Sequence, residues 1–189
     1  PDKSTLATSG LLITLWDTHT GEQLNNLFGF GVSKLDVVFS PDGKVLASGS
    51  GNGTVVLGDP ATGTALLTLT GHTDRVNSVA YSPDGKTLAS GSADSMIILW
   101  DALTGERLQT LTGHTSSVNS VAFSPNGQTL ASGAEDGSII LWDLSTATPI
   151  HTLTGHTDAV TRVAFSPDGT LLASASKDGT VILWETTPE

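Results

Sequence analysis

A segment of 42 residues recurs along this chain, and it constrains the fold more than any other feature of the sequence. Gly-His pairs end at His72, His114 and His156, and Trp-Asp pairs or related dipeptides keep the same interval at 16, 58, 100, 142 and 184. The motif "SPDG" or "SPNG" recurs at the same interval, starting at positions 40, 82, 124 and 166. A unit this short cannot bury a core alone, so the units are expected to stack on one another.

Each unit reads as four β-strands. In one of them, Val76–Ser82 leads through a Pro-Asp-Gly turn into Thr87–Ser92. The third segment, Ile97–Asp101, is almost wholly apolar, which predicts a strand buried on both faces. Arg107–Gly113 is more polar and is expected to be the outermost strand. Since no segment has helical periodicity, the predicted fold class is all-β.

The composition narrows the classes of partner. Among 189 residues there are 19 acidic and 8 basic side chains, a net charge of −11 with neutral histidines. A chain this acidic, without a basic run, is expected to bind neither nucleic acid nor a membrane surface. It has no cysteine, which excludes disulfides and thiolate metal sites. We expect no metal, no cofactor and a cytoplasmic location; a first residue Pro1 favours a processed or cloned segment.

Taken together, "GH", "SPDG", "LASGS" and "ILWD" at a period of 42 resemble the WD-repeat β-propeller family, in particular the near-identical repeats of bacterial arrays. The resemblance implies four-stranded antiparallel blades around a central channel and a role as a rigid platform for protein partners. The chain then holds about 4.5 repeats as a single propeller segment, 1–189. Its predicted parts are a partial unit (1–28), a degenerate repeat (29–70), two complete repeats (71–112 and 113–154) and a last repeat without its fourth strand (155–189).

Four residue types recur as a set in three units. The sets are His72, Ser90, Asp94 and Trp100; His114, Ser132, Asp136 and Trp142; and His156, Ser174, Asp178 and Trp184. A Ser-His-Asp group can be an activated nucleophile. However, an active site is needed once, whereas a set present in three units indicates a structural part. The resemblance implies that each tetrad is a hydrogen-bonded chain from the loop before the first strand to the second and third strands. No residue is predicted to be catalytic.

One unit departs from this pattern. Its tetrad positions hold Phe30, Ser48, Asn52 and Gly58. One hypothesis is that the network was lost as a set, with Phe30 supplying some of the missing volume; the other is drift in a unit supported by its neighbours. The N-terminal unit has Trp16 without a matching His or Asp.

The number of strands predicts an incomplete ring. Three strands, three sets of four and three further strands are too few for a seven-bladed propeller. Two chains could complete a ring of eight blades, the segment Gln23–Phe28 of one chain becoming the fourth strand of the other chain's last blade. The alternatives are an excised segment that associates less regularly and a small ring closed by one chain. We favour completion by a second chain, and therefore a homodimer.

Positions that vary between units are the candidates for partner binding. They lie in the loops after Gly-His and before the tetrad Asp, and at one first-strand position; the predicted rim comprises Asp74, Arg75, Ser116, Ser117, Glu135, Asp158, Arg162 and Lys177. The competing interpretation is that exposed loop positions vary freely.

These observations favour a non-catalytic protein-interaction scaffold, a module of a larger signalling or regulatory protein. Three alternatives stay open at this level. They are an enzyme that uses a Ser-His-Asp set, a multivalent binder of small ligands with one site per blade, and a segment suited to the study of propeller assembly that has no partner of its own.

Overall fold

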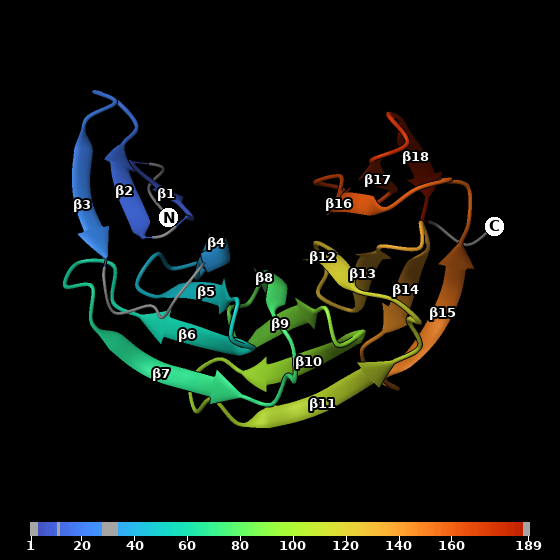
Figure 1. The fold of residues 1–189 in the computed structure, drawn as a ribbon, viewed down its shortest axis with the longest axis horizontal. Coiled ribbons are helices and arrows are strands. Elements are labelled where there is room, and N and C mark those ends of the chain that lie inside the picture. Colours follow the sequence, from blue (N-terminus) through green and yellow to red (C-terminus); the bar gives the residue numbers. More distant parts are fainter. Residues whose placement is uncertain (1–3, 11, 28–33, 187–189) are drawn as a thin grey trace.

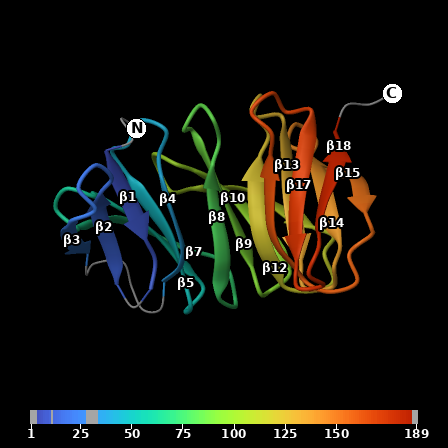
Figure 2. The same ribbon diagram turned by 90° about the horizontal axis from the view of Figure 1, so that it is seen from above.

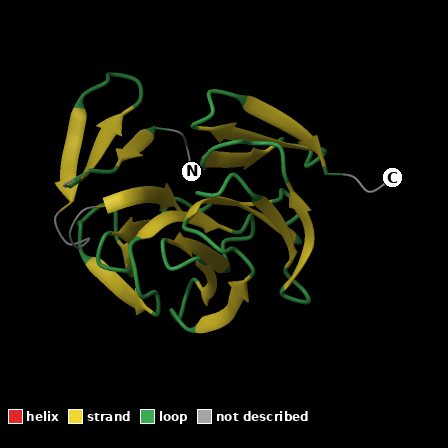
Figure 3. Cartoon of the chain, turned by 45° about the vertical axis from the view of Figure 1, so that its right-hand side comes forward, coloured by secondary structure: helices red, strands yellow, loops and turns green. Residues whose placement is uncertain are grey.

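The structure is a computed structural model that describes residues 4–10, 12–27 and 34–186. It contains five antiparallel β-sheets arranged side by side in an open arc (Figure 1). The described residues form strands and loops without a helix (Figure 3), in agreement with the predicted all-β class. No helix that could cross a membrane occurs in this part of the chain.

Eighteen strands of the described residues make up the sheets. They are β1 (Thr5–Thr8), β2 (Ile13–Asp17), β3 (Gln23–Leu27), β4 (Lys34–Phe39), β5 (Leu46–Ser50), β6 (Thr54–Gly58), β7 (Ala65–Thr70), β8 (Val76–Tyr81), β9 (Thr87–Ser92), β10 (Met96–Asp101), β11 (Arg107–Thr112), β12 (Val118–Phe123), β13 (Thr129–Ala134), β14 (Ile139–Asp143), β15 (Thr148–Leu153), β16 (Val160–Phe165), β17 (Leu171–Ser176) and β18 (Val181–Glu185).

Each sheet is a meander of consecutive strands. The orders are β1-β2-β3, β4-β5-β6-β7, β8-β9-β10-β11, β12-β13-β14-β15 and β16-β17-β18. The two three-stranded sheets form the ends of the arc, with β4, β8, β12 and β16 innermost and β7, β11 and β15 outermost (Figure 1). Seen from above, the strands run from one rim of the arc to the other (Figure 2). The strand count of three, four, four, four and three agrees with the sequence.

A separate apolar core fills each junction between adjacent sheets. Between the β8–β11 and β12–β15 sheets, Ile97 and Leu99 pack with Val121 and Trp142. The next residue along β10, Ile98, faces the other way and belongs to the core shared with the β4–β7 sheet. The third strand is therefore buried on both faces, as its apolar sequence predicts, and each sheet depends on its neighbour for stability.

Glycine in the second strand permits this close packing. A Cβ atom on Gly91 would lie 2.7 Å from Val118 Cγ1 of the next sheet, and one on Gly49 would lie 2.8 Å from the Val76 carbonyl oxygen. Such distances are too short for a side chain, so these positions require glycine. The last sheet has Ala175 at the equivalent place.

One tight turn lacks the glycine found in its equivalents. Gly53, Gly137 and Gly179 have φ of 83°, 82° and 84°, and Ser95 takes the same left-handed conformation with φ of 68°. A side chain in this region carries a steric cost. The sequence difference at Ser95 therefore marks mild strain rather than a different turn.

Tyr81 carries a buried hydroxyl for which the described residues provide no hydrogen-bond partner. The equivalent positions are Phe39, Phe123 and Phe165. Burial, with a smaller contribution from the charge of Asp42, raises the pKa of Tyr81 to about 12. The hydroxyl therefore stays neutral and unpaired, which costs free energy.

We expect Tyr81→Phe to stabilise the protein by about 1 kcal/mol, because it removes an unpaired polar group and keeps the ring. Thermal unfolding followed by circular dichroism should show a rise in Tm of about 3 °C. The matched control is Phe123→Tyr, which should lower Tm. A lower Tm for Tyr81→Phe would mean that the hydroxyl does have a partner.

Candidate functional site

The first complete tetrad is a continuous hydrogen-bonded chain. His72 Nδ1 lies 2.9 Å from Asp94 Oδ2, and His72 Nε2 lies 2.8 Å from Ser90 Oγ. Trp100 Nε1 donates to the same Ser90 oxygen at 2.8 Å. The chain joins the loop before β8 to β9 and β10, which is the connection that the sequence predicts.

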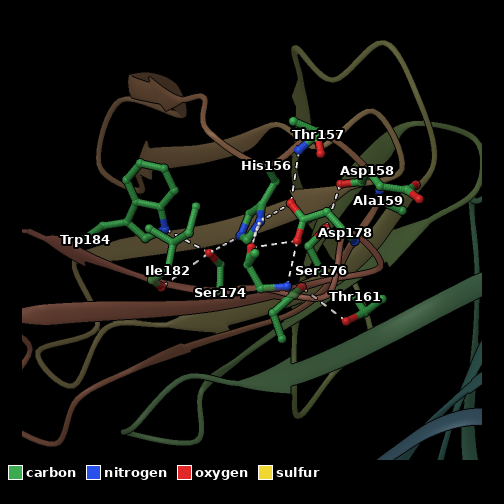
Figure 4. Close-up of polar contacts among 12 residues, drawn as sticks. His156, Thr157, Asp158, Ala159, Thr161, Ser174, Ser176, Asp178, Ile182 and Trp184 are labelled. Atoms are coloured by element: carbon green, nitrogen blue, oxygen red, sulfur yellow. Dashed lines mark hydrogen bonds and ion pairs between the residues drawn. The ribbon is translucent and has the colours of Figure 1, made fainter.

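The C-terminal tetrad has the same geometry (Figure 4). His156 bridges Asp178 Oδ2 at 2.8 Å and Ser174 Oγ at 2.7 Å, and Trp184 Nε1 donates to Ser174 Oγ at 2.9 Å. The N–H of Thr157 also donates to Asp178. The Asp178 carboxylate thus fixes both the ring and the backbone of the loop before β16.

The middle tetrad is different, and the prediction of three equal sets is wrong here. His114 Nε2 lies 2.6 Å from Ser132 Oγ and Trp142 Nε1 donates to that oxygen, but His114 Nδ1 faces Ser138 Oγ at 3.4 Å instead of Asp136. Asp136 accepts bonds from Thr115 Oγ1 and from Ser138.

A neighbouring substitution accounts for this difference. In the other two units Ser92 and Ser176 accept the N–H of the tetrad Asp and donate to a carbonyl of the loop before the first strand. Ala134 occupies that place in the middle unit, and the Asp136 N–H turns to Ser116 Oγ. Losing one hydroxyl therefore moves Asp136 away from the ring of His114.

The electrostatics of the tetrads follow from these contacts. Burial raises the pKa of Asp94, but the N–H groups of Thr73 and Met96 and the bond with His72 outweigh it, so the pKa lies below its usual range. The pKa of Asp178 is also lowered, first by the Thr180 hydroxyl. Burial lowers the pKa of His114 to about 4, and the attraction of Asp136 offsets only part of this. His114 is therefore a neutral, buried imidazole at pH 7.

Comparison with known families agrees with this geometry. A family model described as WD domain, G-beta repeat, matches residues 21–59, 63–101, 105–143 and 147–185, which is most of the chain. The chain belongs to the WD40 family. The family predicted from the repeats is thus confirmed, and WD40 domains are typically non-catalytic interaction scaffolds. A search of curated proteins found no match.

The WD40 matches are offset from the sheets. Each match starts beside the outer strand of one sheet and ends with the third strand of the next: β3–β6, β7–β10, β11–β14 and β15–β18. One repeat therefore links two neighbouring blades. The β1–β2 hairpin lies outside all four matches.

The degenerate WD40 repeat keeps little of its tetrad. Phe30 lies outside the described residues. Ser48 is fully buried, and among the described residues its hydroxyl reaches the Gly49 carbonyl oxygen alone, at 3.5 Å. Asn52 accepts from the N–H and hydroxyl of Thr54, a contact within its own turn. Gly58 pairs with Leu46 in the backbone ladder and provides no ring donor for Ser48.

We expect Gly58→Trp to give no gain in Tm, because the hypothesis of compensated loss leaves no space for a second large ring. Differential scanning calorimetry measures this directly, with Trp100→Gly as the reverse substitution in an intact repeat. A clear increase in Tm would instead support drift, since Ser48 would then have accepted a new indole donor.

The N-terminal unit retains half of a WD40 tetrad. Trp16 Nε1 donates to Thr8 Oγ1 at 3.0 Å, and Thr8 stands where the complete repeats have serine. In the described part of the chain, neither a His nor an Asp ties this pair to a loop, as the sequence predicts. This hairpin is therefore held less firmly than a complete blade.

The predicted rim residues in the loops divide into two groups. Asp74, Arg75, Glu135, Asp158 and Lys177 are exposed, and Lys177 Nζ bridges neighbouring blades to Glu135 at 3.0 Å. Ser116 and Ser117 are half-buried and already bonded. Ser116 accepts from Asp136, and Ser117 accepts from Asn77 of the preceding blade.

Arg162 lies apart from the loop residues of the rim. It lines a central cavity of about 550 Å³ bounded by β4, β8, β12 and β16. Its guanidinium lies 3.9 Å from Asp36, which joins the last sheet to the first four-stranded sheet. Such an exposed pair contributes little to stability. Arg162 is thus placed at the channel rather than in the loops where a partner is expected.

Several inter-blade contacts escaped the sequence analysis. Asp36 accepts the N–H of Val79 in the next blade, and Ser78 and Ser120 accept the N–H groups of Val121 and Val163 in the same way. Asn77 and Asn119 donate to carbonyls one blade further on. Their recurrence at an interval of 42 is the signal that could have indicated them.

The tetrad serines are poorly suited to catalysis. Ser90 and Ser132 have 0% and Ser174 has 1% of their surface exposed, and each oxygen is held by both a histidine and a tryptophan. Among the residues that the structure describes, no group of three or more His, Asp or Glu side chains could hold a metal ion.

Proposed function

We propose that this WD40 chain is a scaffold for protein partners, a module of a larger signalling or regulatory protein, and that partners bind at the rim. The observation that carries this proposal is the contrast between buried, recurring tetrads and exposed, variable loop residues. Six side chains of the rim are both variable and exposed, namely Asp74, Arg75, Glu135, Asp158 and Lys177 in the loops and Arg162 at the channel. The cytoplasmic location stays a prediction.

Site-specific photo-crosslinking tests the rim. A benzophenone amino acid is placed at Asp158 or Asp74, and, as a matched control, at Lys44 or Lys86 in the turns at the opposite rim. Rim positions should label a discrete protein in the native host extract, and that protein should bind the purified chain more weakly after Asp158→Lys. Equal labelling from both rims, or unchanged binding, would contradict the proposal.

The competing enzyme hypothesis has its own test. A serine-directed phosphonate should leave Ser90, Ser132 and Ser174 unmodified, since each hydroxyl is buried and doubly bonded. Saturable labelling of any of the three, found by mass spectrometry of the intact chain, would support catalysis instead.

We further propose that a second copy completes the arc. Among the described strands β18 pairs with β17 only, and Val181 and Leu183 of β18 are 68% and 64% exposed. Their equivalents Ile139 and Leu141 in β14 are 0% and 5% exposed because the next blade covers them. Burying one such side chain stabilises by about 2 kcal/mol.

The occupant favoured is β3 of the second copy. Its equivalents β7, β11 and β15 are each the outer neighbour of a strand equivalent to β18. In addition, the four family matches begin with β3 and end with β18, so together they hold the strands of four blades. Two chains joined at both ends would make eight, within the usual range for propellers.

Sedimentation equilibrium over a range of concentrations tests completion. The expected mass is twice the 19.4 kDa of one chain. A compact monomer at every concentration would contradict it, and would favour the single-chain ring or a longer chain that supplies the missing strand itself.

A further inference from the structure

We infer that the β1–β2 hairpin is an internal substitute for β17–β18 of the second copy, and that it must leave before two chains can join. This inference rests on the proposed ring and adds a control step to it. The hairpin pairs with β3 in the position that the incoming strand would take, so the two compete for one place.

The hairpin and the β17–β18 pair carry equivalent residues. β2 reads "ITLWD" and β18 reads "VILWE", four repeats later. Ile13 and Leu15 of β2 are buried against Leu46 and Val56 of the β4–β7 sheet. Val181 and Leu183 are their equivalents in β18, and these are the two side chains left exposed at the other end of the arc. The surface that β2 covers is therefore one that β18 would fit.

The pattern of glycines also supports packing of the last sheet of one chain against the β4–β7 sheet of another. Gly49, Gly91 and Gly133 face a valine of the next sheet, where a Cβ would collide. The junction between β1–β3 and β4–β7 differs, since its sequence has Ser9 in place of glycine and Lys34 in place of valine. At this position the last sheet has Ala175, which carries a Cβ atom as Ser9 does and as the three glycines do not. The last sheet is thus suited to the junction that the hairpin now occupies.

The hairpin is built to be displaced more easily than a blade. Among the described residues, its sheet has no counterpart of the first strand of a complete blade, and no His or Asp ties the Trp16–Thr8 bond to a loop. Leu6 is half exposed, whereas the equivalent Leu46 and Leu88 are fully buried. Thr14 stands where the other units have valine or isoleucine, and its hydroxyl donates to Asn26 Oδ1 at 3.0 Å. A polar pair on this face is unfavourable for the packing of another sheet against it.

Two cysteine pairs distinguish the two states, because the chain has no cysteine of its own. Thr14 and Asn26 are directly opposite in β2 and β3, so Thr14→Cys with Asn26→Cys locks the hairpin in place when oxidised. Ile182 is the equivalent of Thr14 in β18, so Ile182→Cys with Asn26→Cys should form a disulfide only when β18 meets a β3. Asn26→Cys alone is the control for both.

We expect the oxidised Thr14/Asn26 variant to remain a monomer, and the same sample to form dimers after reduction, with at least a tenfold fall in apparent Kd. The reduced sample is the folding control for the oxidised one. If the oxidised and reduced forms dimerise equally, the hairpin is not a substitute strand. Ile13→Ser should promote dimers while leaving the sequences of β3 and β18 unchanged, whereas Ile97→Ser in the complete repeat should not.

The Ile182/Asn26 variant keeps the two proposals separable. Covalent dimers on a non-reducing gel support completion by a second copy. A disulfide within one chain would show a single-chain ring, and the absence of any disulfide, together with a monomeric mass, would overturn the proposed ring itself. Dimers that form at the same rate whether or not the hairpin is locked would overturn only the role of the hairpin.

Discussion

Replacing Trp142 with alanine is expected to lower the free energy of unfolding by about 4 kcal/mol. The ring is fully buried, its Nε1 donates to Ser132, and its edge lies against Gly113, where a Cβ would be 2.9 Å from the ring. The substitution therefore creates a cavity and removes one donor from a buried network. Urea unfolding followed by circular dichroism measures the loss as a shift of the midpoint.

Trp16→Ala is the matched control for this prediction. Trp16 is only partly buried, and its Nε1 donates to the exposed hairpin residue Thr8. We expect a loss of about 1 kcal/mol, because little apolar surface is uncovered. If the two variants lose the same free energy of unfolding, the complete tetrad and the full burial of Trp142 contribute no extra stability.

The repeat made most of the fold predictable. Glycine, proline and Asp-Gly positions at a fixed interval mark the turns, and the apolar runs such as Ile97–Asp101 mark the buried third strands. The contacts within a tetrad were expected from the resemblance to the family, and His72, Ser90, Asp94 and Trp100 make them.

Contacts between repeats were harder to predict, because a comparison of copies aligns equivalent residues and does not reveal which of them touch. Ser78 and Ser120 stand at the position equivalent to Arg162, and each accepts a hydrogen bond from the backbone of the next inner strand. Arg162 was included in the rim because its counterparts differ, and that comparison could not show that it lies at the channel beside Asp36. Asp136 was expected to hold His114, but the effect of Ala134 on its backbone is visible only in three dimensions.

His114 should make the stability of the protein depend on pH in a defined window. Its pKa in the folded chain is about 4, against 6.5 when exposed, because burial disfavours the imidazolium. As the pH falls through 6.5, His114 of the unfolded chain binds a proton, whereas His114 of the folded chain stays neutral. The contribution of His114 to the free energy of unfolding is therefore fully present above pH 6.5. It falls by about 3 kcal/mol between pH 6.5 and pH 4.

Nuclear magnetic resonance of the imidazole protons tests this, with the signal assigned by its loss in His114→Gln. The His114 resonance should stay that of a neutral ring down to about pH 4. The window lies above the titration of Asp94, Asp136 and Asp178, whose pKa values are all lowered, so those carboxylates do not obscure it. A midpoint near 6.5 would contradict the prediction.

The substitution Ala134→Ser tests whether the missing hydroxyl causes the low pKa of His114. With a serine there, the N–H of Asp136 regains the partner that Asp94 and Asp178 have, and its carboxylate can approach His114 Nδ1. We expect the pKa of His114 to rise toward its ordinary value and the loss of stability between pH 6.5 and 4 to shrink. An unchanged pKa would assign the effect to burial of the ring alone.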